Sequence, residues 1–406
     1  MKRSVAVIFD RFGPYHIARL KAAAEHLDVT AIEVAATTSE YAWDAVDTET
    51  SFKRETLFKN VEGDSSNQRP AQIAGRMFEA LNDANVEGVF VPGWATVAAQ
   101  SALSWCLKNG RPAIVMSEST AFDSDRKWHR EAIKRRVVSL FSAGLVGGTP
   151  QVEYLEKLGL SRERVFTGYD VVDNDFFEGG AKEAQRRNEK GERRLPENYF
   201  LASARFIEKK NLPAVIRAYA EYRKKSEIGD WKREVWDLVI LGDGPLRPEL
   251  CSLIADLRLQ RSILMPGFKQ YDELPGYYAR AGAFIHASTS EQWGLVVNEA
   301  MASGLPVLVS SRCGCAPDLV RQGKNGFTYD PASIEKLTEL MVTLAHLSPD
   351  RLREMGEASR GIIAGFTPRH FGEGASQAIN AAFRGQMKRG NSLDLLLLDA
   401  LSYRWV

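Results

Sequence analysis

The chain has 406 residues, more than one typical hydrophobic core accommodates, and this length suits two domains of ordinary size. Its 53 basic and 52 acidic residues give a net charge of +1, which argues against a protein whose whole surface attracts nucleic acid. Four cysteines are too few for a disulfide framework, and no Cys or His pair with zinc spacing accompanies Cys313 and Cys315, so we expect reduced thiols and no metal site.

The first apolar run, residues 5–9, is too short for a signal peptide and has no small-residue cleavage site after it. No other run approaches the length of a membrane span. We therefore expect a cytoplasmic protein, either free or at the inner face of the membrane.

Short apolar runs alternate with longer amphipathic stretches along the chain, which is typical of βα units around parallel sheets. In the first half the predicted strands are 5–9, 29–34, 88–92, 112–117 and 143–148. In the second half they are 199–204, 236–242, 262–266, 283–287 and 306–310. Two such series predict an α/β protein with two doubly wound domains, which face one another across a cleft at the carboxyl ends of the strands.

The loop D-R-F-G-P-Y-H-I-A-R-L (10–20) follows the first predicted strand and leads into a helix. It lacks the G-x-G-x-x-G pattern of dinucleotide-binding enzymes, which counts against a dehydrogenase. His16 in this loop is a candidate for an acceptor-binding or catalytic group, and a structural histidine on a helix face is an equal alternative.

Glu118 follows the predicted strand 112–117, where a carboxylate could activate an acceptor hydroxyl as a general base or simply cap the next segment. A basic group then follows, which could hold an anionic acceptor or form a solvated face: Arg126, Lys127, His129 and Arg130.

Two segments of the chain could contact a lipid surface that carries a lipid-linked acceptor. The predicted helix 128–141 mixes a basic triplet with apolar residues, and the tail 392–406 is strongly apolar. The alternative is that the helix packs on the first sheet and that the tail covers an apolar groove or a partner.

Arg205 and Lys210 lie in the loop after the predicted strand 199–204. A guanidinium and an ammonium there can neutralise two phosphates and the charge that grows on a leaving diphosphate. With these cations present, no divalent metal is required. The alternative is a solvated basic cluster, since Lys209 and Arg217 are close in sequence.

The segment H-A-S-T-S-E-Q-W-G-L-V-V-N-E-A-M-A-S-G-L-P (286–306) places Glu291 and Glu299 on either side of a glycine that can open a helix. The amides of Gly294, Leu295 and Val296 would form the helix N-terminus, which suits an anion such as a diphosphate. A carboxylate on each side could hold hydroxyl groups, and a diphosphate flanked by hydroxyls describes a sugar nucleotide. The alternative for either glutamate is an ordinary acid near a helix start.

Four ordered segments of the chain resemble the signature of the retaining GT-B glycosyltransferases of family four, the glycosyl transferases group 1 type. They are S-A-R-F-I-E-K-K-N (203–211), L-G-D-G-P with P-G-F (241–245 and 266–268), the segment 286–306, and A-P-D-L-V with N-G-F (316–327). The resemblance covers residues 165–385 well, and residues 1–165 only in layout.

The resemblance implies the GT-B fold, with two doubly wound Rossmann-like domains facing a central cleft. It implies an N-terminal acceptor-binding domain at 1–175, a donor-binding domain at 176–365, and at 366–406 a helix that returns to the N-terminal domain, followed by the apolar tail. The implied activity is the transfer of a sugar from a nucleoside diphosphate sugar to the hydroxyl of a glycan or lipid-linked acceptor, with retention, in polysaccharide or glycolipid biosynthesis. UDP is favoured as the commonest nucleotide of such families, and neither a cofactor nor a nucleic acid is expected.

The resemblance also assigns roles to residues of the donor-binding domain. It places Arg205 and Lys210 at the phosphates, Glu291 at hydroxyls of the transferred sugar, and Glu299 at the ribose. Gly242 and Gly244 would form a tight turn beneath the nucleotide, and Phe268 would contact the base.

In the N-terminal domain, Gly13 would lie in the loop that touches the donor phosphate or the acceptor. Many relatives have a histidine near the reacting sugar where this chain has Glu118, so the identity of an acceptor-activating base stays open.

Two other hypotheses keep the fold and change the function. The first is a sugar-nucleotide epimerase or a phosphorylase, although a starch-type phosphorylase would carry a pyridoxal lysine and no such site is recognisable. The second is a non-catalytic partner that binds a sugar nucleotide or a membrane in an assembly.

Overall fold

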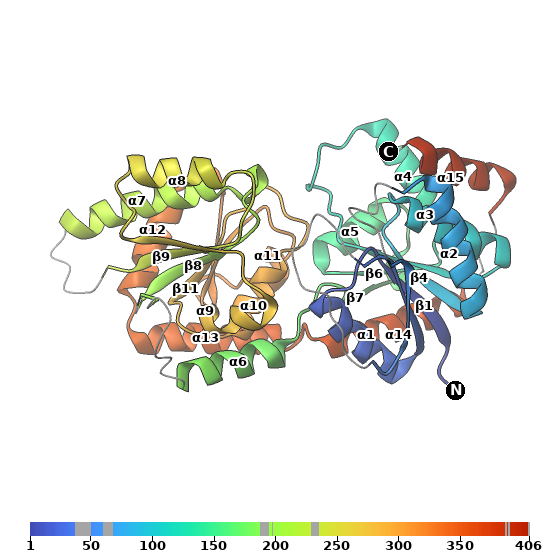
Figure 1. Ribbon diagram of the computed structural model, residues 1–406, viewed down its shortest axis with the longest axis horizontal. Helices are drawn as coiled ribbons and strands as arrows, with labels where there is room; N and C mark the ends of the chain where they lie inside the picture. The colour runs from blue at the N-terminus through green and yellow to red at the C-terminus, as the bar shows by residue number, and fades with distance from the viewer. Residues whose placement is uncertain are drawn as a thin grey trace. The chain divides into compact units, whose positions relative to one another are not determined.

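The computed structural model describes residues 1–36, 50–59, 68–186, 195–196, 198–228, 235–385, 388 and 390–404. The chain divides into two compact units, each built on one sheet with helices around it (Figure 1). Unit 1 comprises Met1–Val172 and Thr367–Val406, and unit 2 comprises Asp173–Phe366. Unit 1 is therefore made of two separate stretches of chain, with all of unit 2 inserted between them.

The sheet of unit 1 has seven parallel strands in the order β3-β2-β1-β4-β5-β6-β7. Their bounds are β1 (Ser4–Phe9), β2 (Asp28–Ala35), β3 (Lys53–Phe58), β4 (Gly88–Pro92), β5 (Ala113–Ser117), β6 (Ala143–Val146) and β7 (Val165–Thr167). The strand order changes direction between β1 and β4, and doubly wound sheets bind their ligands at the carboxyl ends of the strands beside such a point.

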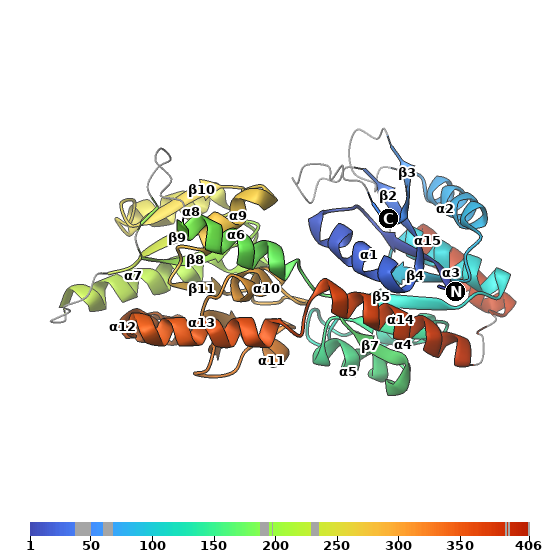
Figure 2. The same cartoon turned by 90° about the horizontal axis from the view of Figure 1, so that it is seen from below.

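The helices of unit 1 come from both of its chain segments. They are α1 (Pro14–His26), α2 (Pro70–Ala84), α3 (Val97–Asn109), α4 (Trp128–Val138), α5 (Thr149–Lys157), the short η2 (Arg162–Arg164), α14 (Pro368–Arg384) and α15 (Ser392–Arg404). Helix α14 lies beside α1 (Figure 2) and packs closely because it presents glycines. A Cβ at Gly372 would lie 2.6 Å from the carbonyl oxygen of Ala22, so only glycine fits there.

The sheet of unit 2 has six parallel strands in the order β10-β9-β8-β11-β12-β13. Their bounds are β8 (Tyr199–Ser203), β9 (Asp237–Leu241), β10 (Ile263–Gly267), β11 (Ala283–His286), β12 (Val307–Ser310) and β13 (Gly326–Tyr329). The helices are α6 (Asn174–Arg186), η3 (Glu208–Lys210), α7 (Leu212–Ile228), α8 (Arg247–Asp256), η4 (Tyr271–Glu273), α9 (Leu274–Tyr278), α10 (Leu295–Ala302), α11 (Ala316–Leu319), α12 (Ile334–His346) and α13 (Pro349–Ile363).

The predicted α/β class is confirmed, and each of the ten predicted strands is present with its ends shifted by at most two residues. Three strands were missed: β3, β7 and β13. All three lie at an edge of a sheet and are only partly buried, so none has the continuous apolar run that marks a central parallel strand.

The helix expected at 128–141 ends at Val138, and the apolar tail forms α15 up to Arg404, with 405–406 outside the described residues. Throughout the described ranges, no helix is both long enough and apolar enough to cross a membrane.

Candidate functional site: a carboxylate, a lysine and a helix N-terminus in unit 2

Glu291 lies in the loop that follows β11, at the carboxyl edge of the second sheet, as its sequence context predicted. Its backbone N–H donates to the carbonyl of Arg312 (3.1 Å), and its own carbonyl accepts from the N–H of Gly314 (3.0 Å). This short parallel bridge ties the Glu291 loop to the loop after β12. The backbone of the candidate site is therefore held from two strands.

Three side chains surround the Glu291 carboxylate. Lys210 forms an ion pair with it, the hydroxyl of Ser288 donates to it at 3.1 Å, and His286 Nε2 lies 3.4 Å away. The side chains of Glu291 and Lys210 are only 12% and 13% exposed, so little water screens the pair. Lys210 comes from the loop after β8 and the other residues from β11 and its loop, so two adjacent strands of the sheet supply the group.

The protonation states within this group follow from its geometry. Burial alone would raise the pKa of Glu291, but the hydrogen bond with His286 and the charge of Lys210 hold it well below its ordinary range. Burial lowers the pKa of His286, although the nearby Glu291 opposes that effect. At neutral pH the site therefore contains an ionised carboxylate beside an ammonium group and a neutral imidazole.

Gly294 opens helix α10 against this group, as predicted for a helix start. Its φ of +106° lies in the left-handed region, and a Cβ there would approach His286 Nε2 to 3.3 Å and Glu291 Cγ to 3.6 Å. The following amides, of Leu295 and Val296, belong to the first turn, where an α-helix has no acceptor for its N–H groups. The partial positive charge of the helix N-terminus thus lies beside Glu291, the residue with which Lys210 pairs.

The loop that carries Arg205 rests on the glycine turn after β9. Phe206 N–H donates to the carbonyl of Asp243 (2.8 Å), and Ala204 N–H donates to that of Leu241 (3.0 Å). Gly242 and Gly244 both have positive φ, and neither position has room for a Cβ because the backbone of residues 204–206 lies against them. The turn therefore supports the Arg205 loop, and its contact with a nucleotide stays a prediction.

Glu299 lies in the interior of unit 2, away from solvent. It projects from the second turn of α10, is 1% exposed, and accepts a hydrogen bond from the hydroxyl of Tyr278 at 2.7 Å. Burial and the negative charge of Glu299 raise the pKa of Tyr278 well above its ordinary value, so this hydroxyl keeps its proton. The ribose role of Glu299 stays a prediction, in which a ribose hydroxyl would join or replace Tyr278 at the carboxylate.

Phe268 follows β10 at the same edge of the sheet and is 39% exposed, which is unusual for a phenylalanine. The next residue, Lys269, forms an ion pair with Glu273 (2.8 Å) and lies over the ring of Tyr277. The predicted contact of Phe268 with a base remains untested.

In unit 1, Gly13 and His16 contact one another at the start of α1. The N–H of Gly13 donates to His16 Nδ1 at 3.0 Å, which fixes this nitrogen as an acceptor and the ring as neutral. Burial, together with the positive charge of Arg19, lowers the pKa of His16 to about 3. His16 thus has a structural task at the helix start, and its acceptor-side role stays a prediction.

The sequence analysis did not identify Asp170, a second acidic residue of unit 1, which lies next to Glu118. Asp170 is fully buried just after β7, and burial followed by the negative charge of Glu118 raises its pKa well above the ordinary value. The guanidinium of Arg19, 1% exposed, opposes that shift and lies over the ring of Tyr169 at 5.2 Å. Arg19 donates through Nε to the carbonyl of Val171. Asp170 therefore lies close to Glu118, and the Arg19 cation acts on the same group.

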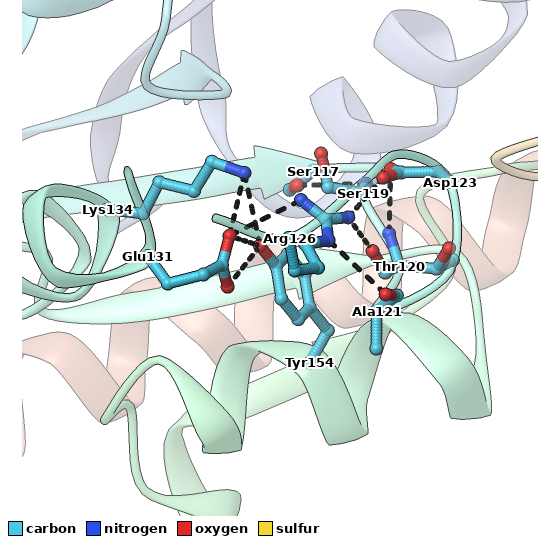
Figure 3. Close-up of polar contacts among 9 residues, drawn as sticks. All are labelled: Ser117, Ser119, Thr120, Ala121, Asp123, Arg126, Glu131, Lys134 and Tyr154. Atoms are coloured by element: carbon cyan, nitrogen blue, oxygen red, sulfur yellow. Dashed lines mark hydrogen bonds and ion pairs between the residues drawn. The ribbon is translucent and has the colours of Figure 1, made fainter. Parts of the chain in front are cut away.

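The segment that follows Glu118 is fixed by Arg126 (Figure 3). The Arg126 guanidinium donates to the carbonyls of Thr120 and Ala121, pairs with Asp123, and lies 4.4 Å from the centre of the Tyr154 ring. Its side chain is 14% exposed. Arg126 is thus engaged within unit 1, whereas Lys127, His129 and Arg130, the other residues considered for an anionic acceptor, are exposed.

Among the described residues, no group of three or more His, Cys, Asp or Glu side chains is placed to hold a metal ion. Cys313 and Cys315 are both buried, and burial raises the pKa of each thiol far above its ordinary value. Both sulfurs therefore stay protonated and are poor metal ligands.

Comparison with known families identifies the domain that carries this site. Residues 183–361 match the family model described as glycosyl transferases group 1. Unit 2 is a glycosyl transferases group 1 domain. Its Lys210, Glu291 and α10 all lie within the matched segment.

Two curated relatives share part of this glycosyl transferases group 1 domain. The sulfoquinovosyl transferase of Arabidopsis thaliana is 37% identical over 126 residues, 30% of this chain and 24% of the relative. The alpha-monoglucosyldiacylglycerol synthase of Acholeplasma laidlawii is 32% identical over 145 residues, 36% of this chain and 33% of the relative. The chain thus spans only a quarter to a third of the length of these relatives.

Solved structures match both units of the chain. The sucrose-phosphate synthase of Thermosynechococcus elongatus has a TM-score of 0.70 at 15% identity and covers 95% of this chain and 100% of that one. HepE of Anabaena, solved with UDP and glucose, has a TM-score of 0.66 at 15% identity and covers 93% of this chain and 99% of that one. At such low identity these matches establish the fold, which is the GT-B fold expected from the sequence.

Proposed function

We propose that the protein is a glycosyltransferase that moves a sugar from a nucleoside diphosphate sugar to an acceptor hydroxyl with retention of the anomeric configuration. The observation that carries the proposal is the contact of Lys210 with Glu291 beside the N-terminus of α10. A diphosphate needs positive charge, and a sugar needs hydrogen-bond acceptors. This arrangement offers both within one loop region.

The Lys210 ammonium and the first amides of α10 would bind the diphosphate, with Arg205 as the second cation. Negative charge grows on the diphosphate as the bond to the sugar breaks, so the same groups stabilise the transition state more than the ground state. A diphosphate would compete with Glu291 for Lys210. The carboxylate would then be released toward the sugar hydroxyls when the donor binds.

Glu291 would orient the transferred sugar. Its depressed pKa keeps it ionised at neutral pH, so it accepts hydrogen bonds from sugar hydroxyls. The neighbouring His286 is neutral and would adjust its hydrogen bond to Glu291 when Lys210 moves. Neither residue is required as a covalent nucleophile, because the acceptor hydroxyl can attack the anomeric carbon from the face that the diphosphate leaves, and the departing diphosphate can take the proton of that hydroxyl.

Glu118 is the candidate for activating or orienting that hydroxyl from unit 1. The acid beside it, Asp170, has a pKa raised well above its ordinary value, and the positive charge of the buried Arg19 opposes that rise. The acceptor is a glycan or a lipid-linked molecule, a class supported by the glycolipid synthase named above. A uridine diphosphate hexose is the favoured donor, since HepE was solved with UDP and glucose.

Thermal unfolding in the presence of UDP, GDP, ADP and their sugars, without added metal, tests the donor site. A ligand at a hundred times its Kd stabilises the native state by about 2.7 kcal/mol, so one nucleotide should raise Tm selectively. Lys210→Ala should abolish the shift. Lys209→Ala is the matched control, because it removes the same charge from an exposed neighbour in η3.

The absence of a shift with every nucleotide would overturn the proposal. If a nucleotide binds, product analysis separates the remaining hypotheses. A transferase consumes the sugar nucleotide only with an acceptor or, slowly, with water, whereas an epimerase changes the sugar while it is still attached to the nucleotide. Proton NMR of the glycosidic product then tests retention.

A further inference from the structure

The large apolar side chains that unit 1 exposes are concentrated on two helices. Six large apolar residues are exposed among the described residues, and four of them belong to α4 and α15. They are Trp128 (82% exposed), Ile133 (38%), Leu393 (73%) and Leu396 (63%). A tryptophan is rarely exposed to this extent. The apolar surface of these helices therefore indicates an interaction site.

Helix α4 combines this apolar surface with positive charge. Lys127, Arg130, Arg135 and Arg136 are all exposed. The acidic residue of the helix, Glu131, is turned inward, where it pairs with Lys134 (3.0 Å) and accepts a hydrogen bond from Tyr154 (3.0 Å) (Figure 3). The exposed face of α4 therefore carries cations and apolar side chains without an acidic neighbour of its own.

An ion pair joins the two helices. Arg136, in the last turn of α4, pairs with Asp394, which is 4% exposed in the first turn of α15. Arg130, Ile133 and Arg136 are spaced three residues apart and share one helix face, as do Leu393 and Leu396. The start of α15 is thereby fixed beside the basic face of α4.

We propose that the α4–α15 surface, formed by Lys127, Trp128, Arg130, Ile133, Leu393 and Leu396, docks unit 1 on an anionic lipid bilayer. The indole ring of tryptophan favours the region between headgroups and acyl chains, and leucine and isoleucine side chains enter the same depth. The arginine and lysine stems reach back to the anionic headgroups. Nucleic acid would use the cations but would leave the leucines in water.

The proposal does not depend on the activity, so it can be tested without an acceptor. Co-sedimentation of the full chain with phosphatidylcholine vesicles, with and without phosphatidylglycerol, measures the partition coefficient directly. We expect binding to the anionic vesicles that weakens as salt is added, and a blue shift of the tryptophan emission on binding. Each cation near an anionic surface changes the partition coefficient about fivefold.

Two variants and a matched control locate the surface. Lys127→Gln with Arg130→Gln should lower binding about 25-fold, because two such factors multiply. Leu393→Ser with Leu396→Ser should remove most of the remaining affinity without disturbing a buried residue. The control, Lys336→Gln with Arg353→Gln, removes the same charge from exposed positions on unit 2 and should bind as the wild type does.

Circular dichroism and thermal unfolding show whether each variant folds as the wild type does. Equal binding of the wild type to neutral and anionic vesicles would overturn the proposal. An effect of the control variant as large as that of the Lys127 and Arg130 variant would also overturn it, and so would the absence of binding to any vesicle.

Discussion

Lys210→Met removes the cation that pairs with Glu291 and keeps most of the volume of the side chain. The carboxylate left behind is only 12% exposed, so water cannot fully replace the lost partner. Breaking a buried ion pair costs about 3–5 kcal/mol when one charge is left uncompensated. The hydroxyl of Ser288 (3.1 Å) and the imidazole of His286 (3.4 Å) remain within reach of Glu291. We therefore expect a loss of about 2–3 kcal/mol of unfolding free energy.

A double-mutant cycle with Glu291→Gln isolates the contribution of the pair. Glu291→Gln alone leaves Lys210 able to turn toward solvent, so its cost should be smaller, about 1 kcal/mol. If the residues interact directly, the double variant should lose about 1–2 kcal/mol less than the sum of the single losses. Hydrogen exchange of the peptides that cover α10 reports the opening free energy of this region for each variant.

The pH dependence gives an independent check with a defined sign. The pKa of Glu291 is depressed in the native state, so its stabilising effect is complete above about pH 4.5 and is lost as the pH falls through the native pKa. Lys210→Met should raise that native pKa and weaken the loss of stability in acid. The charge of Lys210 also lowers the pKa of His286, so this histidine should titrate at a higher pH in the variant. Strict additivity in the cycle, with an unchanged acid profile, would refute the reasoning.

Gly294→Ala places a Cβ at a φ of +106° and should cost about 1–2 kcal/mol and reduce nucleotide-induced stabilisation in thermal unfolding. The control Gly276→Ala, in helix α9 and with no atom near its added Cβ, should not destabilise the protein and should keep the nucleotide effect. Asp170→Asn removes an acid whose raised pKa lets the native state hold a proton that the unfolded chain releases above about pH 4. Relative to the variant, the wild type should lose about 1.4 kcal/mol per pH unit from that pH up to the raised native pKa in urea titrations, and a pH-independent difference would contradict a raised pKa of Asp170. Tyr278→Phe removes a 2.7 Å hydrogen bond to the buried Glu299, so unit 2 should lose about 2–3 kcal/mol of unfolding free energy in urea. A loss below about 0.5 kcal/mol would mean that other hydrogen bonds satisfy the Glu299 carboxylate.

Part of the unit 2 site could be placed from the sequence because it is local, whereas the contact of Lys210 with Glu291 spans 81 residues and depends on the pairing of β8 with β11. Glu291 and Gly294 lie within one strand–loop–helix segment, and a glycine followed by apolar helical spacing marks where the helix begins. The sequence did not identify His286 as a partner of Glu291, since a histidine at the end of an apolar strand is also typical of a core residue. Its position directly at the strand's carboxyl end was the one available signal.

The proximity of Glu118, Asp170 and Arg19 in unit 1 could not be predicted because these residues come from distant parts of the chain. Glu118 follows β5, Asp170 follows β7 and Arg19 lies in α1, and only the sheet order brings them together.

The burial of Glu299 could not be predicted from the sequence for a different reason. Its spacing from Glu291 is readable in the sequence, but whether α10 turns it toward solvent or toward Tyr278 depends on how α9 packs. Burial of that kind is a tertiary property.

The insertion of unit 2 within unit 1 decides which fragments of this protein can be made. Unit 2 is one continuous stretch, so residues 173–366 contain every strand of their sheet. A fragment that ends at residue 172 has all seven strands of the first sheet but lacks α14, whose Gly372 and Gly374 fit against the backbone of Ala22 and Thr167. During synthesis, that face of the first sheet therefore stays uncovered until the whole second domain has left the ribosome and α14 follows it. Until then this apolar face can aggregate unless a chaperone covers it.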